Sequence, residues 1–274
     1  MMKKTGIKHL FQTIKKTGVT FFATAFIASV CLCIYVGFQS TGLAILNRAD
    51  RYFEESQLET FEITCANGIT QEDLEAIAGW EGVRNVEGGY SQSMLLDLGG
   101  ERVPVQARSM LDGMNILTVE EGQLPQTLDE VAIEQDMAEQ LNIALGDTIT
   151  LDHDEALVSD TFVVTAIVND PVFCCSNIKD TRGRGTVGTG SNKYFVELRK
   201  DAFNTDHYED CFTTAYVDSD VLDGIYYFSQ EYETQEQDYL DSLDALAQER
   251  AELRYDTLLT DSQEKIDEAQ GDID

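Results

Sequence analysis

Residues 18–38 form an apolar segment, GVTFFATAFIASVCLCIYVGF, that contains no charged side chain. The hydrocarbon core of a bilayer needs roughly 20 helical residues of this kind, so the segment is long enough to cross a membrane. Five lysines precede it, whereas the chain beyond Arg51 is strongly acidic. Because cytoplasmic flanks carry an excess of lysine and arginine, we expect a transmembrane helix over residues 17–39, with a cytoplasmic N-terminus and the bulk of the chain outside.

A cleaved secretory signal peptide is the competing interpretation, since such signals also begin with a basic segment before an apolar one. The apolar segment here is longer than the roughly 7 to 15 residues of a signal's hydrophobic region. No small-x-small cleavage pattern stands at its end, where Tyr35, Phe38 and Gln39 lie. An uncleaved anchor therefore fits the sequence better.

Residues 1–16 precede the apolar segment and are expected to face the cytoplasm. Their apolar side chains recur at helical spacing between lysines, at Ile7, Leu10, Phe11 and Ile14. This pattern is typical of an amphipathic helix that lies on the inner leaflet. A disordered basic tail is the alternative.

Charge is distributed unevenly along the chain. The net charge is −31, yet residues 1–51 hold seven of the 19 basic residues and only one of the 50 acidic ones. Nucleic acid and anionic lipid are poor partners for so acidic a remainder. We interpret the acidity as a solvated surface that keeps an exposed domain soluble.

Residues 40–218 are expected to form the external domain, beginning with a continuation of the membrane helix over 40–60. Alternating apolar residues predict strands at 61–65, 83–94, 102–107, 130–133, 148–151 and 161–168. Helices are predicted after Thr70, where Thr70 with Asp73 resembles a capping box, and over 135–141, with Met137, Ala138 and Leu141 facing inward. Turns are predicted at Asn67-Gly68, Gly99-Gly100 and Gly146-Asp147. The irregular alternation of strands and helices favours an α+β fold.

Two single residues in this region support specific predictions. Pro104 cannot donate a ladder hydrogen bond, so it predicts an edge strand over 102–107. Trp80 follows an apolar helical face and is expected to anchor the edge of a core.

Residues 219–274 are predicted to be a coiled-coil helix without proline. Apolar residues recur every seven positions, with one six-residue step, at Ile225, Tyr232, Tyr239, Leu246, Leu253, Leu259, Ile266 and Ile273. A seven-residue repeat is typical of a coiled-coil seam. An ordinary surface helix is the alternative.

The cysteines do not fix a disulfide pattern. Cys31 and Cys33 lie in the apolar segment, which leaves Cys65, Cys174, Cys175 and Cys211 outside it. Four cysteines allow three pairings, and free buried thiols are equally compatible with the sequence. A metal site is disfavoured, because there is no CxxC and neither His153 nor His207 stands at a ligand spacing.

No motif predicts catalysis or cofactor binding. Gly183, Gly185 and Gly188 match GxGxxG, but a nucleotide site needs a helix after the glycines and a strand-like KYFVEL follows here. The acidic run 152–155 lacks the spacing of an EF-hand loop and is expected to be a hairpin tip. P-loop, GxSxG and HExxH sequences do not occur. We therefore predict no catalytic, cofactor-binding or metal-binding residue, and we expect that the protein is not an enzyme.

One stretch of the external domain carries a longer motif. It runs from Asn115 through Gly122-Gln-Leu-Pro125 and Glu130-Val-Ala-Ile133 to Gly146-Asp147-Thr-Ile-Thr-Leu151. This resembles the "eGrlP … nEi.i … iGDti.l" pattern of ABC-transporter permeases of the MacB and FtsX type. The following FVVTAIVNDP resembles the next strand of that family. The motif is moderately specific over residues 115–168, and elsewhere only the order of features is similar.

The resemblance implies a MacB-like extracytoplasmic core domain and a permease subunit in the cell membrane. A cytoplasmic ABC ATPase, and a second permease in a homodimer or a partner permease, are the implied partners. Mechanotransmission would be the mechanism, and the motif residues would be scaffold residues. Complete permeases of this type have further spans after the external domain, so this chain would correspond to an N-terminal portion.

Two other classes of function compete with the permease. A free-standing, membrane-anchored adaptor or binding protein would use the acidic domain and the terminal helix to recruit a partner without an ATPase. An anchored enzyme is the third class, but no nucleophile, base and orienting group can be assembled from the sequence. Co-purification of an ATPase would discriminate the permease from the adaptor.

Overall fold

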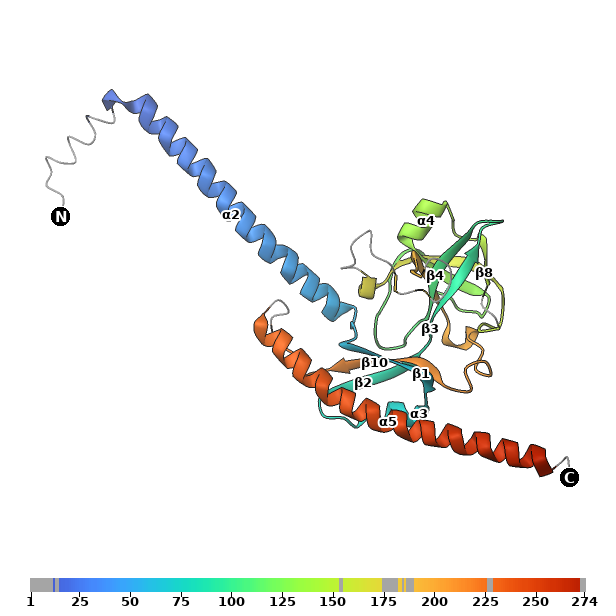
Figure 1. Ribbon diagram of the computed structural model, residues 1–274. Helices are drawn as coiled ribbons and strands as arrows, with labels where there is room; N and C mark the ends of the chain where they lie inside the picture. Colours follow the sequence, from blue (N-terminus) through green and yellow to red (C-terminus); the bar gives the residue numbers. More distant parts are fainter. Residues whose placement is uncertain are drawn as a thin grey trace. The chain divides into compact units, whose positions relative to one another are not determined.

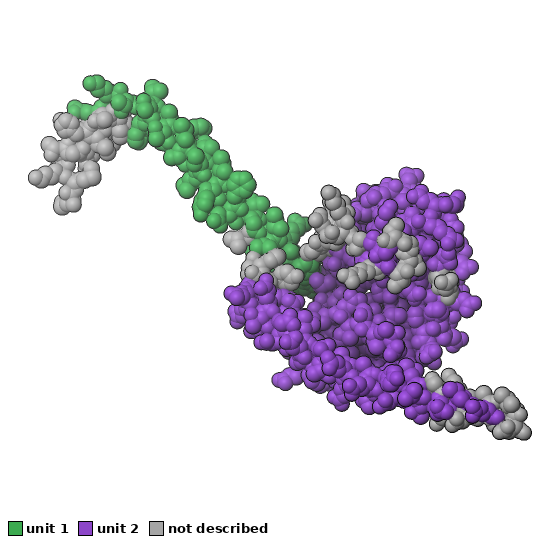
Figure 2. Space-filling model, viewed as in Figure 1, with its two compact units in different colours: residues 1–54 green, residues 55–274 purple. Residues whose placement is uncertain are grey.

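The computed structural model describes residue 12 and residues 15–152, 155–173, 182, 183, 185, 190–225 and 229–271. The chain divides into two compact units, Met1–Glu54 and Glu55–Asp274 (Figure 2). Most of the predicted amphipathic helix lies outside the described residues, as do His153, Cys174, Cys175 and Gly188.

The first unit consists chiefly of helix α2 (Gly18–Glu55), which is long and apolar enough to cross a membrane. Its apolar side chains have no protein neighbours that bury them; Phe22 and Phe26 are 68% and 70% exposed. Hydroxyl groups within it bond back to the helix, as when Thr41 Oγ1 donates to the Gly37 carbonyl at 2.8 Å. The predicted continuation of the helix beyond residue 38 is confirmed as far as Glu55.

The second unit contains a small antiparallel sheet in the order β1-β10-β2. Its strands are β1 (Phe61–Ile69), β2 (Val83–Gly89) and β10 (Phe212–Ser219). Helices α3 (Gln71–Ala78) and α5 (Gln230–Gly271) pack against it (Figure 1). Thr70 begins α3 with the predicted capping box, because its hydroxyl accepts from the Asp73 amide while the Asp73 carboxylate accepts from the Thr70 amide.

Helix α5 is the predicted C-terminal helix, and its apolar repeat has two environments. Tyr239 and Leu243 are buried on the small sheet, where the Tyr239 hydroxyl donates to the Glu81 carbonyl at 2.9 Å. Farther along, Leu253, Leu259 and Ile266 are 50–58% exposed. The first half of the seam therefore packs on the chain's own sheet, and the second half is open.

The larger sheet has seven strands in the order β5-β8-β6-β9-β4-β3-β7. They are β3 (Ser91–Asp97), β4 (Arg102–Ser109), β5 (Thr118–Gly122), β6 (Glu130–Glu134), β7 (Thr148–Asp152), β8 (Thr161–Asn169) and β9 (Tyr194–Leu198). Because β7 also pairs with β8, the strands β8-β6-β9-β4-β3-β7 close into a barrel. Helix α4 (Gln135–Leu141) follows β6 and buries Met137 and Ala138, as predicted. The turns η1 (Pro171–Phe173) and η2 (Lys200–Ala202) follow β8 and β9.

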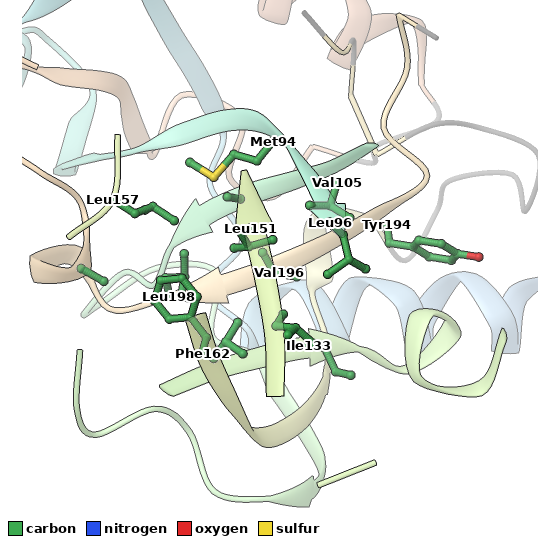
Figure 3. Close-up of a cluster of buried hydrophobic side chains, with 14 of the residues drawn as sticks. Met94, Leu96, Val105, Ile133, Leu151, Leu157, Phe162, Tyr194, Val196 and Leu198 are labelled. Atoms are coloured by element: carbon green, nitrogen blue, oxygen red, sulfur yellow. The ribbon is translucent and has the colours of Figure 1, made fainter. Parts of the chain in front are cut away.

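The barrel interior is the main hydrophobic core (Figure 3). Side chains from opposite strands meet there, among them Met94, Leu96, Ile133, Phe162 and Val196, all at most 1% exposed. Strand β8 alternates buried and more accessible residues along its length, which is the pattern of a strand with one face toward a core. The predicted α+β class is confirmed, but its closure into a barrel was not predicted.

The barrel closes where β5 and β7 share one edge of β8. The Gly146 amide donates to the Val164 carbonyl at 2.8 Å, and the Gln123 amide donates to the next carbonyl, Thr165, at 2.9 Å. Gly122 lies against this point with φ +83°, and a Cβ there would stand 2.1 Å from the Thr165 oxygen. The motif glycines at 122 and 146 are therefore structural residues of the closure.

Two predictions about strands were wrong. The single strand expected over 83–94 is divided between the two sheets, because the chain passes from β2 to β3 at Gly89-Tyr90. This passage is tight, since a Cβ on Gly88 would lie 2.4 Å from the Phe212 ring. Asn67-Gly68, expected as a turn, lies where the register of β1 shifts against β10.

The edge strand expected from Pro104 is also wrong, since β4 lies between β3 and β9. The Pro104 carbonyl accepts from the Lys193 amide at 2.9 Å, on the side that faces β9. The proline nitrogen, which carries no N–H, faces the same side, and pairing of β4 with β9 begins only at Val105. The proline therefore removes no ladder hydrogen bond.

We predict that Gly122→Ala destabilises the domain by more than Gly146→Ala. Both glycines have positive φ, which costs an alanine about 1–2 kcal/mol, but a Cβ at 146 meets no atom within 4 Å. Overlap with the Thr165 oxygen should add about 1–3 kcal/mol at 122. Urea unfolding of the full chain in nanodiscs measures the difference, and equal costs would contradict the account of closure.

Candidate functional site at the junction of the two sheets

The linker that joins α2 to β1 is fixed to the loop between β4 and β5. The carbonyls of Ser56 and Gln57 accept from the amides of Ile116 and Asn115 at 2.8 and 3.0 Å. The Asn115 side-chain oxygen accepts from the Glu59 amide at 3.0 Å. Gln57 and Asn115 have φ of 47° and 49°, a conformation that non-glycine residues adopt only when their surroundings hold them there.

Arg108, on β4, is the centre of a buried charged cluster beside this linker. One of its terminal nitrogens lies 2.9 Å from Asp170 Oδ2, and its Nε lies 3.7 Å from Glu197 Oε1. The guanidinium carbon lies 5.3 Å from the ring centre of Phe173 and 5.6 Å from that of Tyr216. Because Tyr216 is on β10, the cluster connects the barrel to the small sheet.

Three carboxyl groups lie near this one cation, and burial raises the pKa of two of them, Glu59 and Glu197. Burial raises the pKa of Glu59 to about 7 against the opposing charge of Arg108. Burial also raises the pKa of Glu197 far above its usual range. Burial therefore disfavours the charged forms of Glu59 and Glu197, while Asp170 lies within hydrogen-bond distance of the Arg108 guanidinium.

The cluster also contains polar atoms whose hydrogen-bonding capacity is not used. Glu59 Oε2, Asn115 Nδ2 and the Tyr216 hydroxyl are buried and have no hydrogen-bond partner among the residues that the structure describes. Buried polar atoms of this kind cost stability, and native domains contain few of them. The junction is thus more polar and less fully bonded than the barrel core.

A second buried ion pair adjoins the first. Arg182 Nε donates to Glu134 Oε1 at 2.8 Å, and the other Glu134 oxygen accepts from the Phe195 amide at 3.3 Å. The Arg182 guanidinium lies 5.6 Å from the Phe173 ring, the same ring that Arg108 approaches. Phe173 therefore contacts both buried arginines.

The glycine motif lies in the loop that this second pair holds. The Asn192 amide donates to the Gly183 carbonyl at 3.2 Å, and the Gly185 amide donates to the Gly190 carbonyl at 3.1 Å. The strand predicted after the glycines is confirmed as β9. In the described part of the chain, this strand and not a helix follows the glycines, which differs from the strand-turn-helix arrangement of a dinucleotide site.

The other residues that we weighed from sequence are dispersed. Asp152 pairs with Arg102 at 3.1 Å, and His207 packs edge-on against Tyr208. Cys65 is a half-buried free thiol and Cys211 a buried one. Trp80 lies at the edge of the small core, as predicted. Among the described residues, no group of three or more His, Cys, Asp or Glu could hold a metal ion.

Sequence reasoning missed the Arg108 cluster, although a signal was present. Glu197 stands inside the otherwise apolar strand YFVEL, all of which is buried. Arg108 likewise follows the apolar alternation of VPVQA. A charged residue at a core-facing position of an apolar strand predicts a buried partner of opposite charge, but only the fold identifies that partner.

No protein-family model matches the chain, and no curated protein sequence matches it. Solved structures do match. One is the extracellular domain of the noncanonical ABC-type transporter YknZ from Gram-positive bacteria, with 16% sequence identity and a TM-score of 0.38. The match covers 65% of this chain and 87% of the YknZ chain. The periplasmic region of MacB from Actinobacillus actinomycetemcomitans has 13% identity and a TM-score of 0.36, with coverages of 66% and 75%.

A domain of a Porphyromonas gingivalis protein described as a permease has 12% identity and a TM-score of 0.32, with coverages of 60% and 69%. These neighbours are parts of transporters or permeases, and none of the three is described as an enzyme. The motif around Gly122 and Gly146 resembles the same class of protein.

We predict that Glu59→Gln changes the pH dependence of stability. The folded-state pKa of about 7 exceeds the ordinary 4.5, so the protonated carboxyl stabilises the fold below pH 4.5 and this contribution is lost as pH rises through 7. The variant should match the parent chain near pH 5 and exceed it at pH 8 by about 2–4 kcal/mol in unfolding free energy. Denaturant titrations across this range provide the measurement.

Glu101→Gln is the matched control, because Glu101 is exposed and is not among the charges that act on Glu59. Its pH profile should run parallel to that of the parent chain. A Glu59→Gln profile that also runs parallel would contradict the assignment of this carboxyl.

We further predict strong coupling between Arg108 and Asp170. Arg108→Met alone leaves a buried carboxylate without its cation and should cost about 3–5 kcal/mol. Adding Asp170→Asn should recover part of that loss, although Asp170→Asn lowers the stability of the parent chain. Additive effects would refute the coupling, and Arg102→Met, which breaks an exposed pair, should cost at most about 1 kcal/mol.

Proposed function

We propose that the chain is a membrane-anchored permease subunit of a MacB/FtsX-type ABC transporter that works by mechanotransmission with a separate cytoplasmic ATPase. In this proposal residues 1–16 lie in the cytoplasm and residues 17–39 cross the membrane. Residues 40–218 form the extracytoplasmic core domain. The predicted segment 219–274 carries the helix with the coiled-coil seam, and this helix is α5, which begins at Gln230 and not at 219 because Ser219 still belongs to β10. The substrate class is left open by the residues of this chain.

The observation that carries the proposal is the pairing of β1 with β10. Strand β1 follows α2 within six residues of Glu55, and β10 precedes α5. The two strands are antiparallel neighbours, with Phe61 opposite Val217. A displacement of the chain that follows the membrane helix would therefore act directly on the sheet to which α5 is packed.

The junction offers the second route for such a displacement. The linker is hydrogen-bonded to Asn115, which belongs to the loop between barrel strands β4 and β5. Arg108 then connects that barrel to Tyr216 of the small sheet. A force on the linker would reach both sheets through hydrogen bonds and packed side chains, with no flexible segment between them.

The family motif supports the same class through its structural role. The Glu130 carboxylate accepts from the Gln126 and Thr127 amides, and the Asp147 carboxylate accepts from the Ala144 amide at 2.8 Å. These carboxylates fix the turns on either side of the barrel closure at Gly122. The resemblance to permeases implied scaffold roles for the motif, and the contacts made by these residues are of that kind.

An anchored adaptor is the alternative function, and the open half of the α5 seam favours it. Leu253, Leu259 and Ile266 would bind an apolar partner whether or not an ATPase is present. Such a partner is compatible with both functions, so the ATPase is the discriminating component.

The test is affinity purification of the tagged full chain from membranes of its source, after crosslinking and with a mild detergent. The permease proposal predicts a P-loop ATPase in amounts comparable with the chain, identified by mass spectrometry. An unrelated single-span protein with the same tag is the control. Enrichment of other partners with no ATPase above this control would contradict the permease and favour the adaptor.

Orientation is tested separately with introduced cysteines. Val158 is 53% exposed, so in a chain whose native cysteines are replaced by serine, Val158→Cys should react with a membrane-impermeant maleimide on intact cells. Lys15→Cys should react only after the membrane is permeabilised, because the basic flank is expected inside. The opposite pattern would refute the proposed topology.

A further inference from the structure

A cavity of about 280 Å³ lies in the second unit, between α5, β1 and α3. Its walls are mainly apolar and include Ile63, Ile69, Ile77, Leu243, Leu246 and Ala247. The volume is near the lower end of the range for small-molecule sites, roughly 300–1,000 Å³. The cavity is separate from the Arg108 junction, since the two sites share no residue.

One ion pair at the cavity is already complete. Arg250 Nε lies 2.6 Å from Asp73 Oδ1, and Asp73 Oδ2 accepts from the amide and hydroxyl of Thr70. The charges of Arg250 and Asp73 therefore cancel, and the carboxylate has its hydrogen-bonding capacity used. This pair leaves no charge for a ligand.

Arg254, one helical turn farther along α5, is different. One of its terminal nitrogens donates to the Cys211 sulfur at 3.3 Å, while its Nε is buried and has no partner among the described residues. Burial raises the pKa of the Cys211 thiol, so the group that Arg254 contacts is neutral. Glu209, Asp210 and Asp73 are nearby acids, yet none forms an ion pair with Arg254 in the described part of the chain.

The cavity is therefore asymmetric in charge. Asp244, bonded to Gln248 at 2.9 Å, is ten residues from Arg254 on the same helix, which corresponds to roughly 15 Å along its axis. A guanidinium with unused donors lies at one end, apolar walls lie between, and a carboxylate lies at the other. This arrangement matches a ligand with one anionic head and one apolar tail.

We propose that the cavity binds a single-chain amphiphilic carboxylate, with its head on Arg254 and its tail between α5 and β1. A carboxylate would accept hydrogen bonds from Arg254 and also neutralise its charge, whereas a neutral head could only accept hydrogen bonds. Each buried methylene strengthens binding by about fourfold, so the tail supplies much of the affinity. Asp244 disfavours a second anionic group, which excludes dicarboxylates of similar length.

Cys65 provides the readout, because its free thiol lines the cavity. The full chain in nanodiscs is treated with a maleimide, and mass spectrometry follows modification of the Cys65 peptide alone. Decanoate should slow this modification at least fivefold and saturably. Decanol at the same free concentration should have little effect. Equal protection by decanol, or no protection by decanoate, would overturn the proposal.

Variants separate binding from packing. Arg254→Gln should raise the half-protecting decanoate concentration at least tenfold, and Arg254→Lys should recover part of that loss because it keeps the charge. Arg84→Gln, which removes an exposed arginine on β2, should change nothing. If Arg254→Gln leaves protection intact, the head group is not on Arg254. If Cys65 is inert before any decanoate is added, a protein segment occupies the cavity and the proposal fails.

Discussion

The pairing of β1 with β10 is the constraint on which the second unit depends. It brings the segment that follows α2 beside the segment that precedes α5, although most of the domain's sequence lies between them. Only this pairing gives α5 an apolar sheet on which to bury Tyr239 and Leu243. The barrel, by contrast, is formed within residues 91–198 and closes on its own strand β8.

The two halves of the domain are held together by different kinds of interaction. The barrel core is apolar, with large side chains such as Phe162 and Phe203 almost inaccessible. The junction instead relies on Arg108, one carboxylate and two carboxyls of raised pKa, with several polar atoms left without partners. Such a junction holds a defined geometry at a cost in stability.

Local sequence signals predicted local structure well. The Thr70 capping box, the apolar helix and the turns at Gly99 and Gly146 depend on neighbouring residues, and each is observed. Features that depend on distant residues could not be found in this way. Barrel closure needs β7 and β5 to share an edge of β8, and the interior position of Pro104 depends on where β9 begins.

The candidate site shows the same difference between features that depend on neighbouring residues and features that depend on distant ones. Glu197 is conspicuous as a charge within an apolar strand, yet its partner Arg108 lies 89 positions earlier in the chain and Glu59 earlier still. The seam of α5 illustrates a related difficulty, because a seven-residue apolar repeat does not say whether a sheet or a helix covers it. Tyr239 packs on a sheet, whereas Leu259 is open.

Amide hydrogen exchange of the full chain in nanodiscs tests the central claim most directly, which is that the pairing of β1 with β10 makes β1 an integral part of the second unit. The account predicts that the amides of β1 paired with β10 exchange as slowly as those of barrel strands β6 and β8, through unfolding of the whole domain. Independent and much faster exchange of β1 would mean that the linker detaches locally, and a detached linker could not transmit a displacement.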